Sequence, residues 1–233
     1  MDRPSTRPQA VLLDAFGTLV AMEPPAPRLR AEVARRAGLE ISAEAAEAAF
    51  SAEIAFYVEH HLEGRDAGSL ERLRDRCAAI VAESLDVPGL EPGAVREAML
   101  AAIRFEAQPD AFGALRALRS GGFRLVVASN WDCSLSEVLA DAGLLGLVDG
   151  VVSSAVAGAA KPDPALFEAA LAVAGTPAEE AVHVGDSRDH DVAGARAAGV
   201  RAILLDRRGT AAPADVPVVR RLDELPSLVL GTA

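Results

Sequence analysis

The residue best placed for chemistry in this chain is an aspartate, Asp14, which directly follows the apolar run Val11, Leu12 and Leu13. Such a run suits a strand that is buried on both faces of a parallel sheet. Ligands bind in the crevice beyond the carboxyl ends of such strands, so we expect the carboxylate in the floor of that crevice, with Gly17 turning the chain away. Taken alone, the stretch fits equally well a turn aspartate that accepts hydrogen bonds from nearby backbone amides.

Further polar residues follow three later apolar segments in the same way. In chain order they are Ser129 with Asn130 after residues 124–128, Lys161 after residues 150–152, and Asp186 with Asp191 after residues 181–184. Lys161 is the single lysine among 23 basic residues, the others all being arginine. A lysine at this one place favours a site that needs a compact ammonium group rather than a planar guanidinium.

The elements that position these residues alternate between strand and helix from residue 108 onward. Strands are predicted over the three segments just named and over Arg201 to Leu205, with helices such as Asp110 to Arg119 and Ala165 to Ala174 between them. Asp163 and Pro164 form a helix start, and Ser134 with Glu137 a possible capping box. Alternation of this kind is typical of an α/β fold with a Rossmann-like, doubly wound parallel sheet.

Residues 28–105 carry a helical pattern instead. Helices are predicted over Leu29 to Ala37, Ala43 to Leu62, Leu70 to Leu85, and Val95 to Phe105. The proline cluster of residues 21–27 is interpreted as a linker, because proline disfavours regular structure. The chain is therefore expected to form an α/β core of residues 1–21 and 108–233, with a small all-helical domain of residues 22–107 inserted after the first strand.

Composition excludes several classes of partner. A formal net charge of −11 argues against nucleic acid, whose phosphates are bound by basic residues, and gives no reason to expect binding to an anionic membrane. No stretch approaches membrane-spanning length, and the polar start of the chain carries no export signal. Cys77 and Cys133 are far apart, so they form neither a metal knuckle nor a disulfide framework, and we expect a cytoplasmic location.

Taken together, the motifs Asp-Ala-Phe-Gly-Thr-Leu, Ser-Asn-Trp-Asp, Lys-Pro-Asp-Pro and Gly-Asp-Ser with a later aspartate resemble, in this order, the haloacid dehalogenase superfamily of hydrolases. The resemblance covers nearly the whole chain and implies that the helical insertion is a mobile cap. It also implies a magnesium-dependent phosphatase that acts on a small phosphorylated metabolite through an aspartyl-phosphate intermediate.

The resemblance assigns roles to individual residues. It implies that Asp14 is the nucleophile and Lys161 a second catalytic residue, that Mg²⁺ is held by Asp14, Asp186 and the backbone carbonyl of Phe16 with Asp191 nearby, and that Thr18, Ser129 and Asn130 bind the phosphoryl group. Elementary electrostatics agrees, because a phosphate that faces three aspartates is repelled unless cations intervene.

One position departs from the family's phosphatase pattern. A second aspartate normally lies two residues after the nucleophile and serves as general acid and base, but this chain has Phe16 there. General acid–base catalysis contributes a factor of about 10² to 10⁴ in rate. We therefore expect that the activity is weak, that the leaving group is good, or that another residue takes over the role of the missing aspartate. The candidate substitutes are Asp132, Asp189 and His190, whereas His183, in an apolar strand, is interpreted as a packed core histidine.

Two alternatives stay open. A halide leaves without protonation, and the family's dehalogenases carry an aromatic residue at the position of Phe16. Those enzymes work without metal and hold the substrate carboxylate with an arginine, a role that cannot be matched to any one of Arg28, Arg30, Arg35 and Arg36. Asp186 and Asp191 would repel an anionic haloacid, which favours the phosphatase. The other alternative is a binding protein without useful turnover. Such a protein would have no physical need to keep Asp14, Lys161 and Asp186 together.

Overall fold

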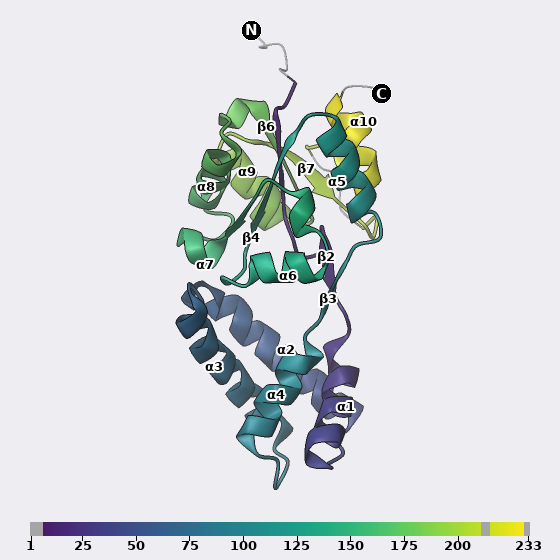
Figure 1. Ribbon diagram of the computed structural model, residues 1–233, viewed down its shortest axis with the longest axis vertical. Coiled ribbons are helices and arrows are strands. Elements are labelled where there is room, and N and C mark those ends of the chain that lie inside the picture. The colour runs from purple at the N-terminus through teal and green to yellow at the C-terminus, as the bar shows by residue number, and fades with distance from the viewer. Residues whose placement is uncertain (1–6, 211–214, 231–233) are drawn as a thin grey trace. The chain divides into compact units, whose positions relative to one another are not determined.

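A six-stranded parallel sheet organises the larger part of the chain (Figure 1). The computed structural model describes residues 7–210 and 215–230. In spatial order the strands are β5 (Gly150–Ser153), β4 (Arg124–Ser129), β1 (Ala10–Leu13), β6 (Ala181–Gly185), β7 (Arg201–Leu205) and β8 (Val218–Val219). In register, Leu13 of the central β1 lies between Val127 of β4 and Val184 of β6. The residues that follow these three strands therefore emerge side by side.

Helices cover both faces of this sheet (Figure 1). They are α5 (Ala111–Ser120), α6 (Leu135–Asp141), α7 (Ser154–Ala157), α8 (Pro164–Ala174), α9 (Ala193–Ala197) and α10 (Leu225–Leu230). On the α8 face, Leu12 and Val126 pack against Phe167 in a buried apolar cluster. The opposite face is covered by α5 and α10. The predicted doubly wound α/β fold is confirmed, and the near-continuous apolar strands reflect burial on both faces.

The two predicted helix starts have different outcomes. The Asp163 carboxylate accepts a hydrogen bond from the amide of Ala165 and Pro164 opens α8, as predicted. Ser134 precedes α6 but makes no side-chain cap, so the predicted capping box is wrong. The amide of Ser134 instead donates to the carboxylate of Asp132 at 2.7 Å. A carboxylate two residues upstream is thus the acceptor at this turn.

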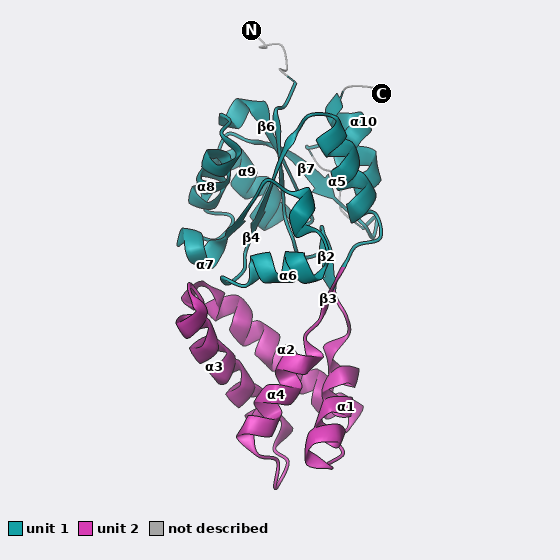
Figure 2. Cartoon of the chain, viewed as in Figure 1, with its two compact units in different colours: residues 1–21, 107–233 teal, residues 22–106 magenta. Residues whose placement is uncertain are grey.

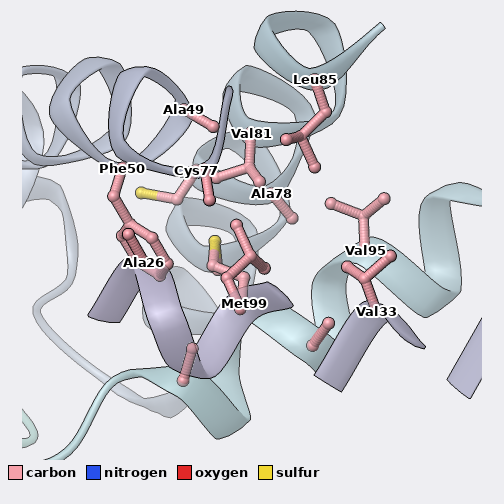
Figure 3. Close-up of a cluster of buried hydrophobic side chains, with 14 of the residues drawn as sticks. Ala26, Val33, Ala49, Phe50, Cys77, Ala78, Val81, Leu85, Val95 and Met99 are labelled. Carbon is pink, nitrogen blue, oxygen red and sulfur yellow. The ribbon is translucent and has the colours of Figure 1, made fainter. Parts of the chain in front are cut away.

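The chain divides into two compact units, one of residues 1–21 and 107–233 and the other of residues 22–106 (Figure 2). The second unit contains α1 (Pro25–Ala37), α2 (Ala43–His60), α3 (Ala67–Leu85) and α4 (Pro92–Ala102). Its core is a cluster that includes Phe50, Cys77, Val81 and Met99 (Figure 3). None of the helices that the structure describes combines the length and apolar character needed to cross a bilayer.

Two predicted boundaries in this region are wrong. The proline cluster does not stay a linker, because α1 begins at Pro25; prolines fit the first turn of a helix, where the missing N–H has no intrahelical partner. The predicted helix Val95 to Phe105 ends at Ala102, and β3 (Phe105–Ala107) follows and pairs with β2 (Val20–Met22). Pairing with a strand far away in the sequence satisfies backbone groups that local periodicity assigns to a helix.

Candidate active site

The ammonium group of Lys161 forms the centre of a charged cluster at the carboxyl ends of β1, β4 and β6. Its Nζ donates to Asp14 Oδ1 at 2.5 Å and to Asp191 Oδ1 at 2.6 Å. All three side chains are at least nine-tenths buried. Burial alone would lower the pKa of Lys161, but the two carboxylates outweigh it and raise the pKa above its usual value. The lysine is therefore a fixed positive charge.

Asp14 lies at the end of the central strand, where its backbone amide donates to the carbonyl of Val184 at 2.9 Å. Besides Lys161, its Oδ1 accepts a hydrogen bond from Ser129 Oγ at 2.8 Å. Burial raises the pKa of Asp14 above its usual value in spite of the adjacent ammonium. Two donors from different segments thus hold this carboxylate in one orientation.

Both oxygens of Asp191 are occupied. Oδ1 accepts from Lys161 and from His183 Nε2, the latter at 2.9 Å, and Oδ2 accepts from the amide of Ser187 at 2.9 Å. Burial would raise the pKa of Asp191, but Lys161 and the His183 hydrogen bond outweigh it and hold the pKa well below its ordinary value. Asp191 is therefore an ionised group that orients the lysine.

His183 is a site residue whose role the sequence did not indicate. It is fully buried in β6 and packs edge-on against Phe167, as expected of a core histidine. Its Nδ1 has no hydrogen-bond partner among the described residues, whereas Nε2 contacts Asp191. We infer that Nε2 carries the proton, because an unprotonated ring nitrogen is less costly to bury alone than an N–H group. His183 therefore helps to position Asp191.

Asp186 adds a third carboxylate at the exposed rim of the cluster. Carboxylate oxygens of Asp14, Asp186 and Asp191 all lie within 4.8 Å of one another. Partial burial and the charges of Asp14 and Asp191 raise the pKa of Asp186 to about 6. Three carboxylates face one ammonium, so the ionised cluster carries two uncompensated negative charges. An all-oxygen donor set with this excess charge fits a hard divalent cation such as Mg²⁺.

Two glycines allow the cluster to pack. Gly17 has a φ of 78°, and a Cβ there would lie 2.1 Å from Asp186 Oδ2. At Gly185, a Cβ would lie 2.1 Å from the carboxylate carbon of Asp191. Both distances are far below van der Waals contact, so a side chain at either position would displace a carboxylate.

The predicted phosphoryl-binding residues have unequal surroundings. Ser129 contacts Asp14 as described. The Asn130 side chain is engaged with the backbone of Lys161, to which it donates at 3.0 Å and from which it accepts at 2.7 Å. Thr18 is fully buried in the turn after β1, and its hydroxyl has no hydrogen-bond partner among the described residues.

Phe16 lies at the surface beside the cluster, with 49% of the residue exposed. Its ring centroid is 6.5 Å from that of the buried Trp131. Of the suggested acid–base substitutes, Asp132 is buried and accepts from Ser134, whereas Asp189 and His190 are exposed. Neither the geometry of Asp132 nor the exposure of the other two singles out a replacement for the missing aspartate.

The structure thus places an acid after the central strand of an α/β sheet, with a lysine and two aspartates around it. The family model described as haloacid dehalogenase-like hydrolase matches residues 8–199, and the chain therefore belongs to this family. The predicted family membership is confirmed.

Individual relatives include both phosphatases and dehalogenases. A phosphoserine phosphatase of Thermus thermophilus is 39% identical over 130 residues, 54% of this chain and 52% of that protein. The solved structure of a haloacid dehalogenase (HAD) phosphatase from Thermococcus onnurineus is 26% identical with a TM-score of 0.65, and the match covers 96% of this chain and 98% of that one. A 2-haloacid dehalogenase from Pseudomonas syringae pv. Tomato is 25% identical with a TM-score of 0.68, covering 97% and 100%. The chain spans about half the length of the curated relatives it matches.

Proposed function

We propose that this protein is a magnesium-dependent phosphatase that acts on a small phosphorylated metabolite, with Asp14 as the nucleophile. The observation that carries the proposal is the cluster itself: a buried ammonium shared by two carboxylates, with a third carboxylate that leaves two negative charges uncompensated. The similarity to named phosphatases supports the same reaction.

In the proposed reaction, Lys161 holds the Asp14 carboxylate toward the phosphorus atom. The Ser129 hydroxyl, which donates to Asp14 in the structure, turns its one O–H to the phosphoryl group. A bond forms between a carboxylate oxygen and phosphorus, and the bond from phosphorus to the leaving oxygen breaks, with the electron pair leaving on that oxygen. Water then attacks the phosphorus of the aspartyl phosphate, and the bond from phosphorus to the Asp14 oxygen breaks with its electron pair returning to the carboxylate. Inorganic phosphate leaves, and the proton of the attacking water passes to solvent. Because its pKa is raised, Lys161 supplies charge rather than a proton throughout.

Asp14, Asp186 and the backbone carbonyl of Phe16 are the groups assigned to hold Mg²⁺. When bound, the ion supplies positive charge that offsets the repulsion between phosphate and carboxylates. Asp191 lies in the same cluster and is among the predicted ligands, but both of its oxygens already accept hydrogen bonds. We therefore assign it to the orientation of Lys161.

The phosphoryl group is assigned to Ser129, Asn130 and Thr18. Since the Asn130 side chain is engaged with the backbone of Lys161, its contact is assigned to the backbone N–H. The Thr18 hydroxyl has no partner among the described residues, but the residue is fully buried, so its contact with the phosphoryl group stays a prediction. The cap role of the helical unit and the cytoplasmic location stay predictions.

Phe16→Asp is expected to raise kcat/KM for alkyl phosphates by about 10²-fold and kcat/KM for aryl phosphates by much less. Alkyl leaving groups are strongly basic and depend on protonation, whereas a nitrophenolate leaves unaided. The measurement is kcat/KM for a matched pair of alkyl and aryl phosphates. Phe16→Asn is the control, because it has the shape of aspartate without an ionisable proton. Equal gains on both substrates would contradict the claim that Phe16 leaves the enzyme without a general acid for the leaving group.

Magnesium affinity is expected to fall by about tenfold between pH 7 and pH 5. The pKa of Asp186 near 6 means that its carboxyl becomes protonated and uncharged below that pH, and a protonated ligand competes with the metal. Titration of the fluorescence of Trp131, the single tryptophan, measures the affinity at each pH. Asp186→Asn should bind weakly at both pH values, and a wild-type affinity independent of pH would contradict the role of Asp186.

A dehalogenase is the second candidate, favoured by the aromatic Phe16 and by the structural similarity to a 2-haloacid dehalogenase. Each arginine considered for the substrate carboxylate already has a partner in the helical unit: Arg28 with Glu23, Arg30 with the carbonyl of Ile41, and Arg35 and Arg36 with Glu32. Halide release from 2-haloacids without Mg²⁺ would support the dehalogenase. Absence of turnover of either substrate class would favour the non-catalytic alternative.

A further inference from the structure

Arg207, in the loop after β7, is bonded to the turn that carries the candidate nucleophile. Its Nε donates to the carbonyl of Gly17 at 3.0 Å, and its Nη2 donates to the carbonyl of Thr18 at 2.7 Å. These carbonyls lie three and four residues after Asp14, although Arg207 is 190 positions from Gly17 in the sequence. One guanidinium group thus binds two consecutive peptide groups of the turn.

The guanidinium is itself fixed by Asp110. Nη1 donates to Asp110 Oδ2 at 2.9 Å and Nη2 to Oδ1 at 3.0 Å, a two-pronged ion pair. Asp110 is 8% exposed, and its Oδ2 also accepts from the amide of Leu222 at 2.8 Å. Burial would raise the pKa of Asp110, but Arg207 and the Leu222 amide outweigh it and lower the pKa. The guanidinium group is therefore held by a buried carboxylate while it binds the turn.

The turn that Arg207 binds is tight. The amides of Leu19 and Val20 both donate to the carbonyl of Ala15, and the amide of Gly17 donates to the carbonyl of Val20. Glycine tolerates several backbone conformations, so the positive φ of Gly17 is not fixed by its own residue type. Bonds to the Gly17 and Thr18 carbonyls restrict the rotation of the Gly17–Thr18 and Thr18–Leu19 peptide groups, which directly follow the peptide group that carries the Phe16 carbonyl.

We propose that Arg207 is a positioning residue for this turn. By fixing the turn, it keeps the Phe16 carbonyl and the Asp14 carboxylate in the arrangement needed to bind Mg²⁺. The proposal rests on the function proposed above. Arg207 is assigned no contact with substrate or metal. It acts through the backbone of Gly17 and Thr18, as groups around a metal site act through its ligands.

Arg207→Ala is expected to weaken binding of Mg²⁺ with beryllium fluoride, a phosphoryl mimic, by about 10- to 100-fold, the usual cost of losing such a supporting group. Binding is followed by the fluorescence of Trp131. Arg207→Lys is expected to be nearly as weak, because an ammonium cannot bond two carbonyls and a bidentate carboxylate in the same planar geometry. Added guanidinium ion, below concentrations that unfold the protein, should restore part of the affinity of Arg207→Ala and none of Arg207→Lys.

Two controls separate positioning from stability. Arg208→Ala removes an exposed arginine one position away and should bind like the wild type. Val229→Ala in α10 removes buried apolar volume and lowers stability, but should leave the affinity unchanged.

If the wild-type protein binds Mg²⁺ with beryllium fluoride and Arg207→Ala binds with the same affinity, the positioning role is overturned and the proposed function stays intact. An equal loss in Val229→Ala would also overturn it, because the effect would then follow stability. A wild-type protein that does not bind Mg²⁺ with beryllium fluoride would overturn the proposed function and this role with it.

Discussion

Asp14→Asn is expected to lower phosphatase kcat by about 10⁴- to 10⁶-fold, the range found when an enzyme loses its nucleophile or the group that activates it. The amide has nearly the same shape as the carboxylate but cannot displace a leaving group from phosphorus. Because Asp14 buries little apolar surface, the fold should be retained. Turnover of p-nitrophenyl phosphate and the thermal unfolding midpoint are the two measurements.

Asp66→Asn is a matched control for this variant. Asp66 caps α3 in the helical unit, and asparagine caps helices about as well as aspartate does. The control should keep full activity and stability. Undiminished turnover by Asp14→Asn would refute its assignment as nucleophile.

Lys161→Met is expected to lower the free energy of unfolding by about 3–5 kcal/mol, the cost of leaving buried charges without their partner. Asp14 and Asp191 would face each other without the ammonium that now bonds both. Mg²⁺ should recover part of this loss by supplying positive charge to the same carboxylates. Urea unfolding with and without Mg²⁺ measures both effects.

The comparison variant is Lys161→Arg, which keeps the charge in a larger, planar group. It should recover more stability than methionine does, without restoring turnover, because the buried site fits a compact ammonium. If Lys161→Met unfolded at the wild-type urea concentration in both conditions, the ammonium would not be the counterion of this cluster.

The sheet could be predicted because its strands are locally distinctive. The apolar run before Asp14 and the segment before Asp186 correspond to β1 and β6, since burial on both faces leaves an uninterrupted apolar stretch. The boundary near Phe105 could not be predicted. The strand there depends on pairing with β2, more than 80 positions earlier, and no local pattern encodes a partner at that distance.

The site was predictable to the extent that its residues follow strands. The structure brings Asp14, Ser129, Lys161, Asp186 and Asp191 together, as the order of the motifs implies. The supporting residues had no such signal. Asp110 and Arg207 are 97 positions apart, and the hydrogen bond of His183 depends on how the chain turns back after β6. Sequence spacing indicates which residues end strands, but not which distant side chains hold them.

The proposed reaction also predicts how its aspartyl-phosphate intermediate can be observed. An aspartate at position 16 would activate the water that hydrolyses the aspartyl phosphate, and Phe16 cannot do so. With an aryl phosphate, formation of the intermediate should be faster than its hydrolysis. A burst of nitrophenol followed by slow turnover is therefore expected.

Trapping that intermediate tests the central claim most directly. Protein turning over p-nitrophenyl phosphate with Mg²⁺ is quenched with borohydride, which reduces an acyl phosphate to an alcohol, and its peptides are mapped by mass spectrometry. We predict conversion of Asp14 to homoserine that requires both Mg²⁺ and the substrate and is absent in Asp14→Asn. An unmodified Asp14 during measurable burst turnover, or conversion at another carboxylate, would contradict the account.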